Sequence, residues 1–310
     1  NIAAICNIND KEKTENTGAI GYKGIGFKTV FIDNDYVYLR TGGYSFRFDR
    51  AYSKYRVDTP WQLQPIWTPR DDVDRQADRI FEEKKDKFRV QFAFRPTLHE
   101  TLRDSDRNFV SLFEDVFINE RVILFIPNIR SVRVFFHDRK RRDIVRTKDS
   151  SSWVVSTYAE DISEELRQFI NNEIDEQEKS GTLKIPTKYY DFKRTSVSFA
   201  CGRDGSRLKK VADSILYCYL PAKDASWGFD FLMNTDMIPN GPRNDIETDL
   251  GINREIAAIA GSKFFDWIND LCRSDENFNI ADVFSLIPNF DDCMSMKGVG
   301  RRYRQLIERF

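Results

Sequence analysis

One short stretch of the chain, residues 18–31, combines glycines and lysines at a density that suits phosphate binding. Glycine permits backbone angles that other residues resist, and it lets a ligand approach the main chain closely. Where such a loop opens into a helix, its free N–H groups and the helix dipole attract anions. The stretch therefore predicts a phosphate-binding loop, and a glycine-rich turn between two elements is the alternative. Its glycines are Gly18, Gly21, Gly24 and Gly26, and its lysines are Lys23 and Lys28.

The spacing of these residues excludes two common phosphate-binding motifs. A P-loop needs Gly-x-x-x-x-Gly-Lys-Ser/Thr, but here Phe27 separates Gly26 from Lys28. The dinucleotide fingerprint needs Gly-x-Gly-x-x-Gly after a strand, but Thr29 stands where the third glycine is required. The stretch is therefore neither of these two loops.

The spacing Ile-Gly-x-x-Gly-Ile/Val-Gly-Phe fits, with Ile20-Gly21 and Gly24-Ile25-Gly26-Phe27 in the required places. This pattern resembles the second glycine box of the gyrase, histidine-kinase and MutL-like (GHKL) ATPases. It is most similar to the ninety-kilodalton heat-shock chaperone and to sacsin-type ATP-binding modules. The resemblance implies that backbone amides of the box hold ATP phosphates, and that the polar run 9–20 is an ATP lid. The implied phosphate-binding residues are Gly21, Tyr22, Lys23, Gly24, Ile25, Gly26, Phe27 and Lys28.

The elements expected after the box support this resemblance. Residues 27–32 predict a short helix, and two strands, 36–41 and 44–49, flank the two-residue hairpin turn Gly42-Gly43. Box, helix and antiparallel hairpin follow one another in this order in the family. The resemblance therefore implies an α+β fold, with a two-layer α/β sandwich of the Bergerat ATP-binding type that lacks its N-terminal part.

A second candidate residue, Arg243, lies in the segment 235–246, after two predicted strands at 215–221 and 228–234. This segment resembles the catalytic loop of the chaperone's middle domain, in which Asp-x-x-Pro leads to an Asn, an Arg and an acidic helix start. The resemblance implies that Arg243 contacts the γ-phosphate of ATP and stabilises the developing phosphoryl charge. The alternative is a surface arginine that caps a loop.

The length of 310 residues suits two domains. We expect a GHKL ATP-binding-like domain over 1–150 and a middle-domain-like α/β module with C-terminal helices over 151–310, with the boundary between 150 and 205. Apolar spacing predicts amphipathic helices at 163–179 and 252–272, and the apolar run 122–126 predicts a central strand.

Composition limits the other classes of function. The net charge of −1 gives no global attraction to nucleic acid. The sequence contains no run of about 18 apolar residues, so we expect neither a transmembrane helix nor a membrane partner. The five cysteines contain no Cys-x-x-Cys pair, which argues against zinc and disulfides and favours a cytoplasmic protein. The two histidines, His99 and His137, lie in no frame typical of nucleophilic catalysis.

The family's general base, its magnesium ligand and its adenine-binding Asp-x-Gly segment precede the lid, so we expect them before Asn1. The cofactors implied are ATP and Mg²⁺, and no metal ligand is expected in this chain. We therefore expect a piece of a larger polypeptide that binds ATP poorly alone. In the intact protein it would be part of an ATP-hydrolysing conformational switch of the chaperone, remodelling or defence type. Protein clients are possible partners.

Two alternatives remain open. The family places a Gly-Thr pair before a strand that corresponds to 88–95, but Asp86-Lys87 stand there, so a catalytically inactive scaffold or interaction module is the first alternative. A nucleic-acid-binding module is the second. It would use the basic clusters at 139–142 and 301–304, and its affinity would fall steeply with salt.

Overall fold

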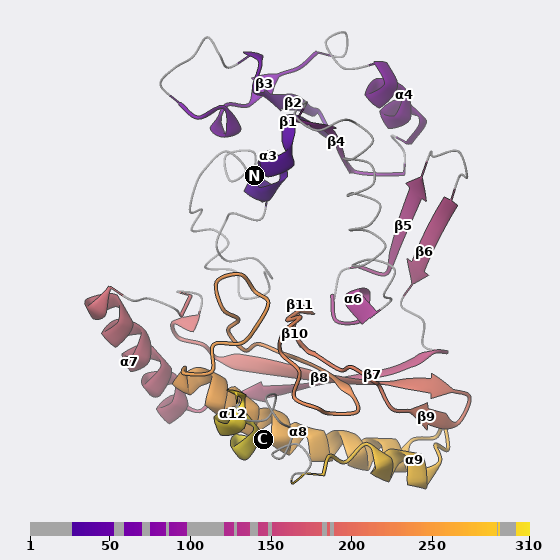
Figure 1. Ribbon diagram of the computed structural model, residues 1–310, viewed down its shortest axis with the longest axis vertical. Coiled ribbons are helices and arrows are strands. Elements are labelled where there is room, and N and C mark those ends of the chain that lie inside the picture. The colour runs from indigo at the N-terminus through magenta and orange to yellow at the C-terminus, as the bar shows by residue number, and fades with distance from the viewer. Residues whose placement is uncertain are drawn as a thin grey trace. The chain divides into compact units, whose positions relative to one another are not determined.

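The protein divides into two compact units, Asn1–Leu112 and Phe113–Phe310 (Figure 1). The expected family boundary at residue 150 stays a prediction. The lid at 9–20, box residues 21–26, residues 105–119 and the basic tip at 137–141 lie outside the described part of the chain. The computed structural model describes residues 27–52, 59–69, 75–84, 87–97, 121–126, 129–136, 142–147, 151–181, 185–186, 189–289, 291 and 302–310.

The first unit contains a four-stranded antiparallel sheet with the strand order β3-β2-β1-β4. The predicted short helix and the hairpin with its Gly42-Gly43 turn are confirmed. The elements of this unit are η1 (Phe27–Thr29), α3 (Val30–Asp33), β1 (Asn34–Thr41), β2 (Tyr44–Asp49), η3 (Trp61–Leu63), β3 (Ile66–Trp67), α4 (Arg75–Lys84) and β4 (Val90–Pro96).

Alternation along β1 and β2 sends apolar side chains to both faces of this sheet. On one face, Val37 and Phe48 are fully buried and pack with Phe31 from α3. On the other face, the rings of Tyr38 and Phe81 stack with centroids 5.4 Å apart, which fixes α4 on the sheet. The helix that follows the glycine box is therefore part of the core of this unit.

The second unit is built on a six-stranded sheet in which β8 is central. Its main path is β11-β10-β12-β8-β7, β9 pairs with β8, and β10 with β12 is the one parallel pair among the described strands. A separate hairpin pairs β5 with β6. The elements are α6 (Arg121–Leu124), β5 (Ser131–Phe136), β6 (Arg142–Thr147), β7 (Trp153–Asp161), α7 (Glu164–Ser180), β8 (Arg194–Asp204), β9 (Arg207–Lys209), β10 (Leu216–Cys218), β11 (Leu220–Pro221), β12 (Leu232–Thr235), α8 (Gly251–Arg273), α9 (Ile280–Ser285) and α12 (Arg304–Arg309).

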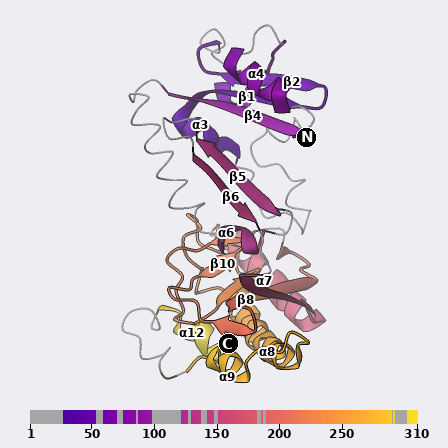
Figure 2. The same cartoon turned by 90° about the vertical axis from the view of Figure 1, so that its right-hand side faces the viewer.

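Helices α7 and α8 cover one face of this sheet, and α6 lies on the other (Figures 1 and 2). On the α8 face, the ring of Phe199 from β8 stacks on Trp267 with centroids 5.2 Å apart. The predicted helices at 163–179 and 252–272 are confirmed, because their apolar spacing matches the faces that they bury. The described elements together make an α+β protein.

The predicted central strand at 122–126 is wrong. Residues Arg121–Leu124 form α6, and Leu124 and Phe125 cover the sheet instead of extending it. Phe125 packs on Tyr217 with ring centroids 5.0 Å apart. A run of five apolar residues satisfies a buried strand and a buried helical turn equally well, so packing decides between them.

Two further predicted strands are shorter than expected. The segment 215–221 is divided into β10 and β11, because Tyr219 adopts a left-handed backbone with φ of 65°. The segment 228–234 is a strand only from Leu232 onward. No helix in the part of the chain that the structure describes is long and apolar enough to cross a bilayer.

Candidate functional site

The last two residues of the glycine box, Phe27 and Lys28, lie in the part of the chain that the structure describes. The Phe27 ring packs 5.5 Å from Phe31 and 5.8 Å from Phe92 between centroids, which anchors the end of the box to the sheet. Lys28 Nζ donates to the Gln62 carbonyl oxygen at 3.2 Å and lies 5.8 Å from the centroid of the Phe31 ring. Both side chains are thus engaged within the first unit, and a phosphate contact from either would use its backbone amide.

The other six residues of the box, 21–26, lie outside the described residues, and their phosphate-binding role stays a prediction. The described candidate site is the Arg243 loop, residues 236–246, in the second unit. This loop leaves the end of β12 and returns to α8. It is narrowed at its base by a bridge between Pro239 and Ile246.

Arg243 itself has a left-handed backbone conformation, with φ of 63°. A bulky residue in this region carries strain of about 1–3 kcal/mol and persists only where its surroundings impose it. Its N–H donates to the Asn240 carbonyl oxygen at 3.0 Å, and its guanidinium Nη2 donates to the Cys218 carbonyl oxygen at 3.2 Å. The arginine is half-buried, and the loop and the end of β10 together hold it in place.

A second left-handed residue, Tyr219, directly follows the carbonyl group that Arg243 contacts. The Tyr219 N–H donates to Asn234 Oδ1 at 2.7 Å, so a β12 side chain satisfies the backbone at the break between β10 and β11. Two strained residues other than glycine therefore meet at one place. Such strain clusters at binding and catalytic sites, where it presets a geometry.

Asp236 ties the start of the loop to the neighbouring strands. Its Oδ1 accepts from the Tyr219 hydroxyl at 2.7 Å, and its Oδ2 accepts from the Ser196 N–H at 2.8 Å and from Thr195 Oγ1 at 3.1 Å. Burial, and then the charge of Asp236, raise the pKa of Tyr219. The tyrosine therefore stays a hydrogen-bond donor at neutral pH.

The side chain of Asn253, on α8, forms hydrogen bonds with backbone groups in and next to the loop. Its fully buried side chain accepts from the Ile238 N–H at 2.8 Å and donates to the Ile238 carbonyl oxygen at 3.0 Å. It also donates to the Glu247 carbonyl oxygen at 2.7 Å. The two bonds to Ile238 satisfy buried backbone groups of an irregular segment, which would otherwise be costly to bury.

The chemistry that this arrangement supports is charge stabilisation by a positioned cation. A guanidinium carries five N–H donors in a planar fork, and this geometry suits phosphate and carboxylate groups. No group of three or more His, Cys, Asp or Glu side chains suited to a metal ion occurs among the described residues. A guanidinium held in this way suits contact with an anion.

Sequence reasoning identified Arg243 but missed the residues that hold it. Asp236 is the first residue of the Asp-x-x-Pro pattern in this loop, so the sequence marked its position. Tyr219 and Asn253 had none, because their hydrogen bonds join parts of the chain that only the fold brings together. The structure places Phe27 and Lys28 in one unit and Arg243 in the other.

Comparison with known proteins gives one distant relative. Protein NO VEIN of Arabidopsis thaliana is 22% identical over an alignment of 291 residues, and the match covers 88% of this chain and 10% of that protein. This chain thus spans about a tenth of the length of the curated relative that it matches. No family model and no solved structure matches the chain.

Proposed function

We propose that this chain is part of an ATP-binding and ATP-hydrolysing conformational switch. The observation that carries the proposal is the Ile-Gly-x-x-Gly-Ile-Gly-Phe box at 20–27, followed at once by a helical turn and an antiparallel hairpin. In this reading, the amides of residues 21–28 hold the phosphates, and the helix start favours their negative charge. Binding would order the lid, and hydrolysis would release it.

Arg243 is the proposed contact to the γ-phosphate. Its support is the resemblance of its loop to a catalytic loop, together with the strained backbone and the dense hydrogen bonding that hold it. An arginine held in advance stabilises charge that develops during phosphoryl transfer with little reorganisation. Its guanidinium matches the geometry of phosphate oxygens better than a lysine would.

The roles proposed for this chain are contacts to the phosphates. Mg²⁺ would neutralise phosphate charge in such a site, but no described cluster of side chains suits it. The proposal assigns the magnesium ligand, the general base and the adenine anchor to other parts of a larger polypeptide. The much greater length of the NO VEIN protein supports the idea of a larger polypeptide as the working unit.

The test is ATP turnover by the intact protein with Gly24→Ala or Arg243→Ala. We expect Arg243→Ala to lower kcat by about 1,000-fold, and Arg243→Lys to restore little of it. Gly24→Ala should weaken ATP binding, because a side chain would obstruct close approach of the phosphates.

Two control variants match these changes. Gly43→Ala adds a methyl group where no atom lies within 4 Å. Arg194→Ala removes an exposed arginine that forms a weak ion pair with Asp161. Turnover that is unchanged in both Gly24→Ala and Arg243→Ala would defeat the proposed mechanism, whereas no ATP turnover by the intact protein would favour the inactive scaffold.

A further inference from the structure

The Arg243 loop is closed by its own hydrogen bonds, but these bonds do not fix it to the rest of the unit. The Asn240 N–H donates to the Asp245 carbonyl oxygen at 2.9 Å, and Asn240 Oδ1 accepts from the Asn244 N–H at 3.2 Å. A left-handed residue inside such a small ring persists only if the ring is held from outside. The outside contacts therefore decide whether Arg243 keeps its conformation.

Asp245 supplies one of these outside contacts. Asp245 is 1% exposed. Its carboxylate oxygen Oδ1 accepts hydrogen bonds from the Tyr303 hydroxyl at 2.6 Å and from the Ile246 N–H at 2.8 Å. Its Oδ2 forms an ion pair with Arg302. A carboxylate buried to this degree depends on its donors, because an unpaired charge is strongly unfavourable there. The loop is therefore tied to residues nearly 60 positions later in the chain.

Tyr303 holds the loop from a second side as well. Its hydroxyl lies 2.8 Å from the Asp224 carbonyl oxygen, and the Asp224 N–H donates to the Asn244 carbonyl oxygen at 2.7 Å. The tyrosine is 1% exposed. Burial, and then its bond to Asp245, raise the pKa of Tyr303, so its hydroxyl remains a donor at neutral pH.

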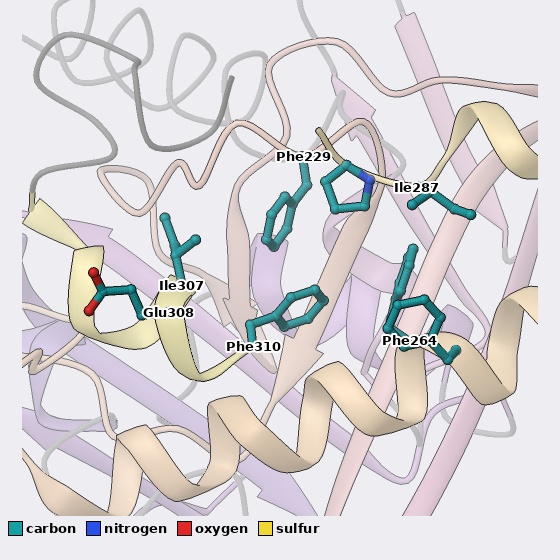
Figure 3. Close-up of a pocket in the computed structure, with 8 residues that line it drawn as sticks. Phe229, Phe264, Ile287, Ile307, Glu308 and Phe310 are labelled. Carbon is teal, nitrogen blue, oxygen red and sulfur yellow. The ribbon is translucent and has the colours of Figure 1, made fainter. Parts of the chain in front are cut away.

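The segment that carries Tyr303 is anchored by apolar side chains. Leu306 and Ile307 on α12 are buried, and the Phe310 ring packs 4.9 Å from Phe229 and 5.7 Å from Phe264 between centroids. These three rings line an apolar pocket of about 190 Å³. Figure 3 gives a close-up of the residues that line this pocket. The anchoring fixes α12 against α8, and with it the position of the Tyr303 hydroxyl.

We propose that Asp245 and Tyr303 are positioning residues for Arg243, so that the segment 302–310 sets the conformation of the arginine that contacts phosphate. The inference rests on the proposed function, since it takes Arg243 to be that contact. Neither residue touches the phosphate. Both act through the loop, by imposing the left-handed backbone at Arg243.

The test uses the intact protein with Tyr303→Phe, which removes one hydroxyl group and keeps the ring. We expect hydrogen–deuterium exchange at the amides of Asn240 and Arg243 to become faster by about tenfold, because the buried carboxylate loses a donor. The kcat for ATP should fall by about 10- to 100-fold through misplacement of Arg243. KM should change by less than about twofold. The matched control is Tyr190→Phe, at a tyrosine that is 52% exposed.

Asp245→Asn is the second variant, since it keeps the size of the side chain and removes its charge. Like Tyr303→Phe, it should make hydrogen–deuterium exchange in the Arg243 loop faster and lower the kcat for ATP. The double variant Tyr303→Phe/Arg243→Ala should lose no more activity than Arg243→Ala alone. A role in general stability would instead add a further loss.

Three results would overturn the inference. The first is unchanged exchange in the loop of Tyr303→Phe. The second is faster exchange with unchanged kcat while Arg243→Ala abolishes turnover, in which case the proposed function stands. The third is unchanged turnover in Arg243→Ala, which removes the proposed role of Arg243 and the inference together, while Gly24→Ala still tests the proposed function.

Discussion

A single glutamate on α7 caps the start of α8, the longest helix among the described residues. Glu173 Oε1 accepts from the Gly251 N–H at 2.9 Å, and Oε2 accepts from the Ile252 N–H at 3.1 Å. The N-cap residue, Leu250, offers no side-chain acceptor, so the free N–H groups of the first turn depend on a carboxylate from another helix. A Cβ at Gly251 would lie 2.5 Å from the end of the Phe169 ring, so a larger residue would require this ring to move.

Glu173→Ala should therefore destabilise the second unit by about 1–2 kcal/mol, because it removes both bonds and a favourable charge at the helix start. Glu173→Gln should retain part of this free energy. The measurement is urea unfolding followed by circular dichroism. Glu176→Ala, at an exposed glutamate on the same helix, is the control. Equal midpoints for Glu173→Ala and the control would show that the cap contributes nothing.

At the scale of the element, α8 is the helix on which the core of the second unit depends. Its Phe264 is 1% exposed and lies among Phe231 at 4.9 Å, Phe199 at 5.8 Å and Trp267 at 5.9 Å between ring centroids. The next residue, Phe265, is 62% exposed. Two adjacent phenylalanines thus differ only in the side of the helix on which they lie.

Phe264→Ala should lower the free energy of unfolding by about 3–5 kcal/mol, through lost apolar burial and the cavity left behind. Phe265→Ala is the matched control and should change it by less than about 1 kcal/mol. Chemical denaturation followed by tryptophan fluorescence measures both, since Trp267 lies in the same cluster. A similar loss in the two variants would contradict the assignment of the buried face.

Helix α7 shows an element whose ends the sequence encodes locally. The Ser163 side chain accepts from the Leu166 N–H at the start, and Gly181, with φ of 69°, ends the helix. Both are common capping choices within a few residues of the helix that they bound. This is why the predicted helix and the observed one nearly coincide.

At the scale of the whole molecule, buried groups that lose a proton in alkali link stability to pH. Burial raises the pKa of Cys201 from an ordinary 9.0 to about 12 and that of Tyr217 from 10.0 to about 12. Below pH 9 both groups are protonated in the folded and unfolded states, and their contribution to the free energy of unfolding is fully present. Above it the unfolded state loses these protons first, so stability falls as pH rises toward 12.

The free energy of unfolding should decrease between pH 9 and 12 by up to about 1.4 kcal/mol per pH unit for each group. Urea denaturation at pH 8, 9, 10 and 10.5 measures the slope. Cys201→Ala removes one of the two groups and should make the slope shallower. A stability that is constant from pH 8 to 10.5 would contradict the burial of both groups.

Features that depend on neighbouring residues could be predicted from the sequence. The Gly42-Gly43 hairpin, α7 and α8 follow from turn residues and from apolar spacing over a few turns, and the α+β class was implied by a resemblance. Of the candidate site, the sequence supplied Arg243 and the glycine box through a resemblance. It supplied neither the left-handed backbone of Arg243 nor the side chains that impose it.

The remaining features depend on the tertiary fold, because the groups concerned lie far apart in the chain. Tyr303 and Asp245 are separated by 58 positions, and Glu173 and Gly251 by 78. The apolar run at 122–126 contains a helical turn whose end, Leu124 and Phe125, packs on the apolar face of the sheet. No local pattern contains such information, since a buried charge or an irregular loop is stable only when packing supplies its partners.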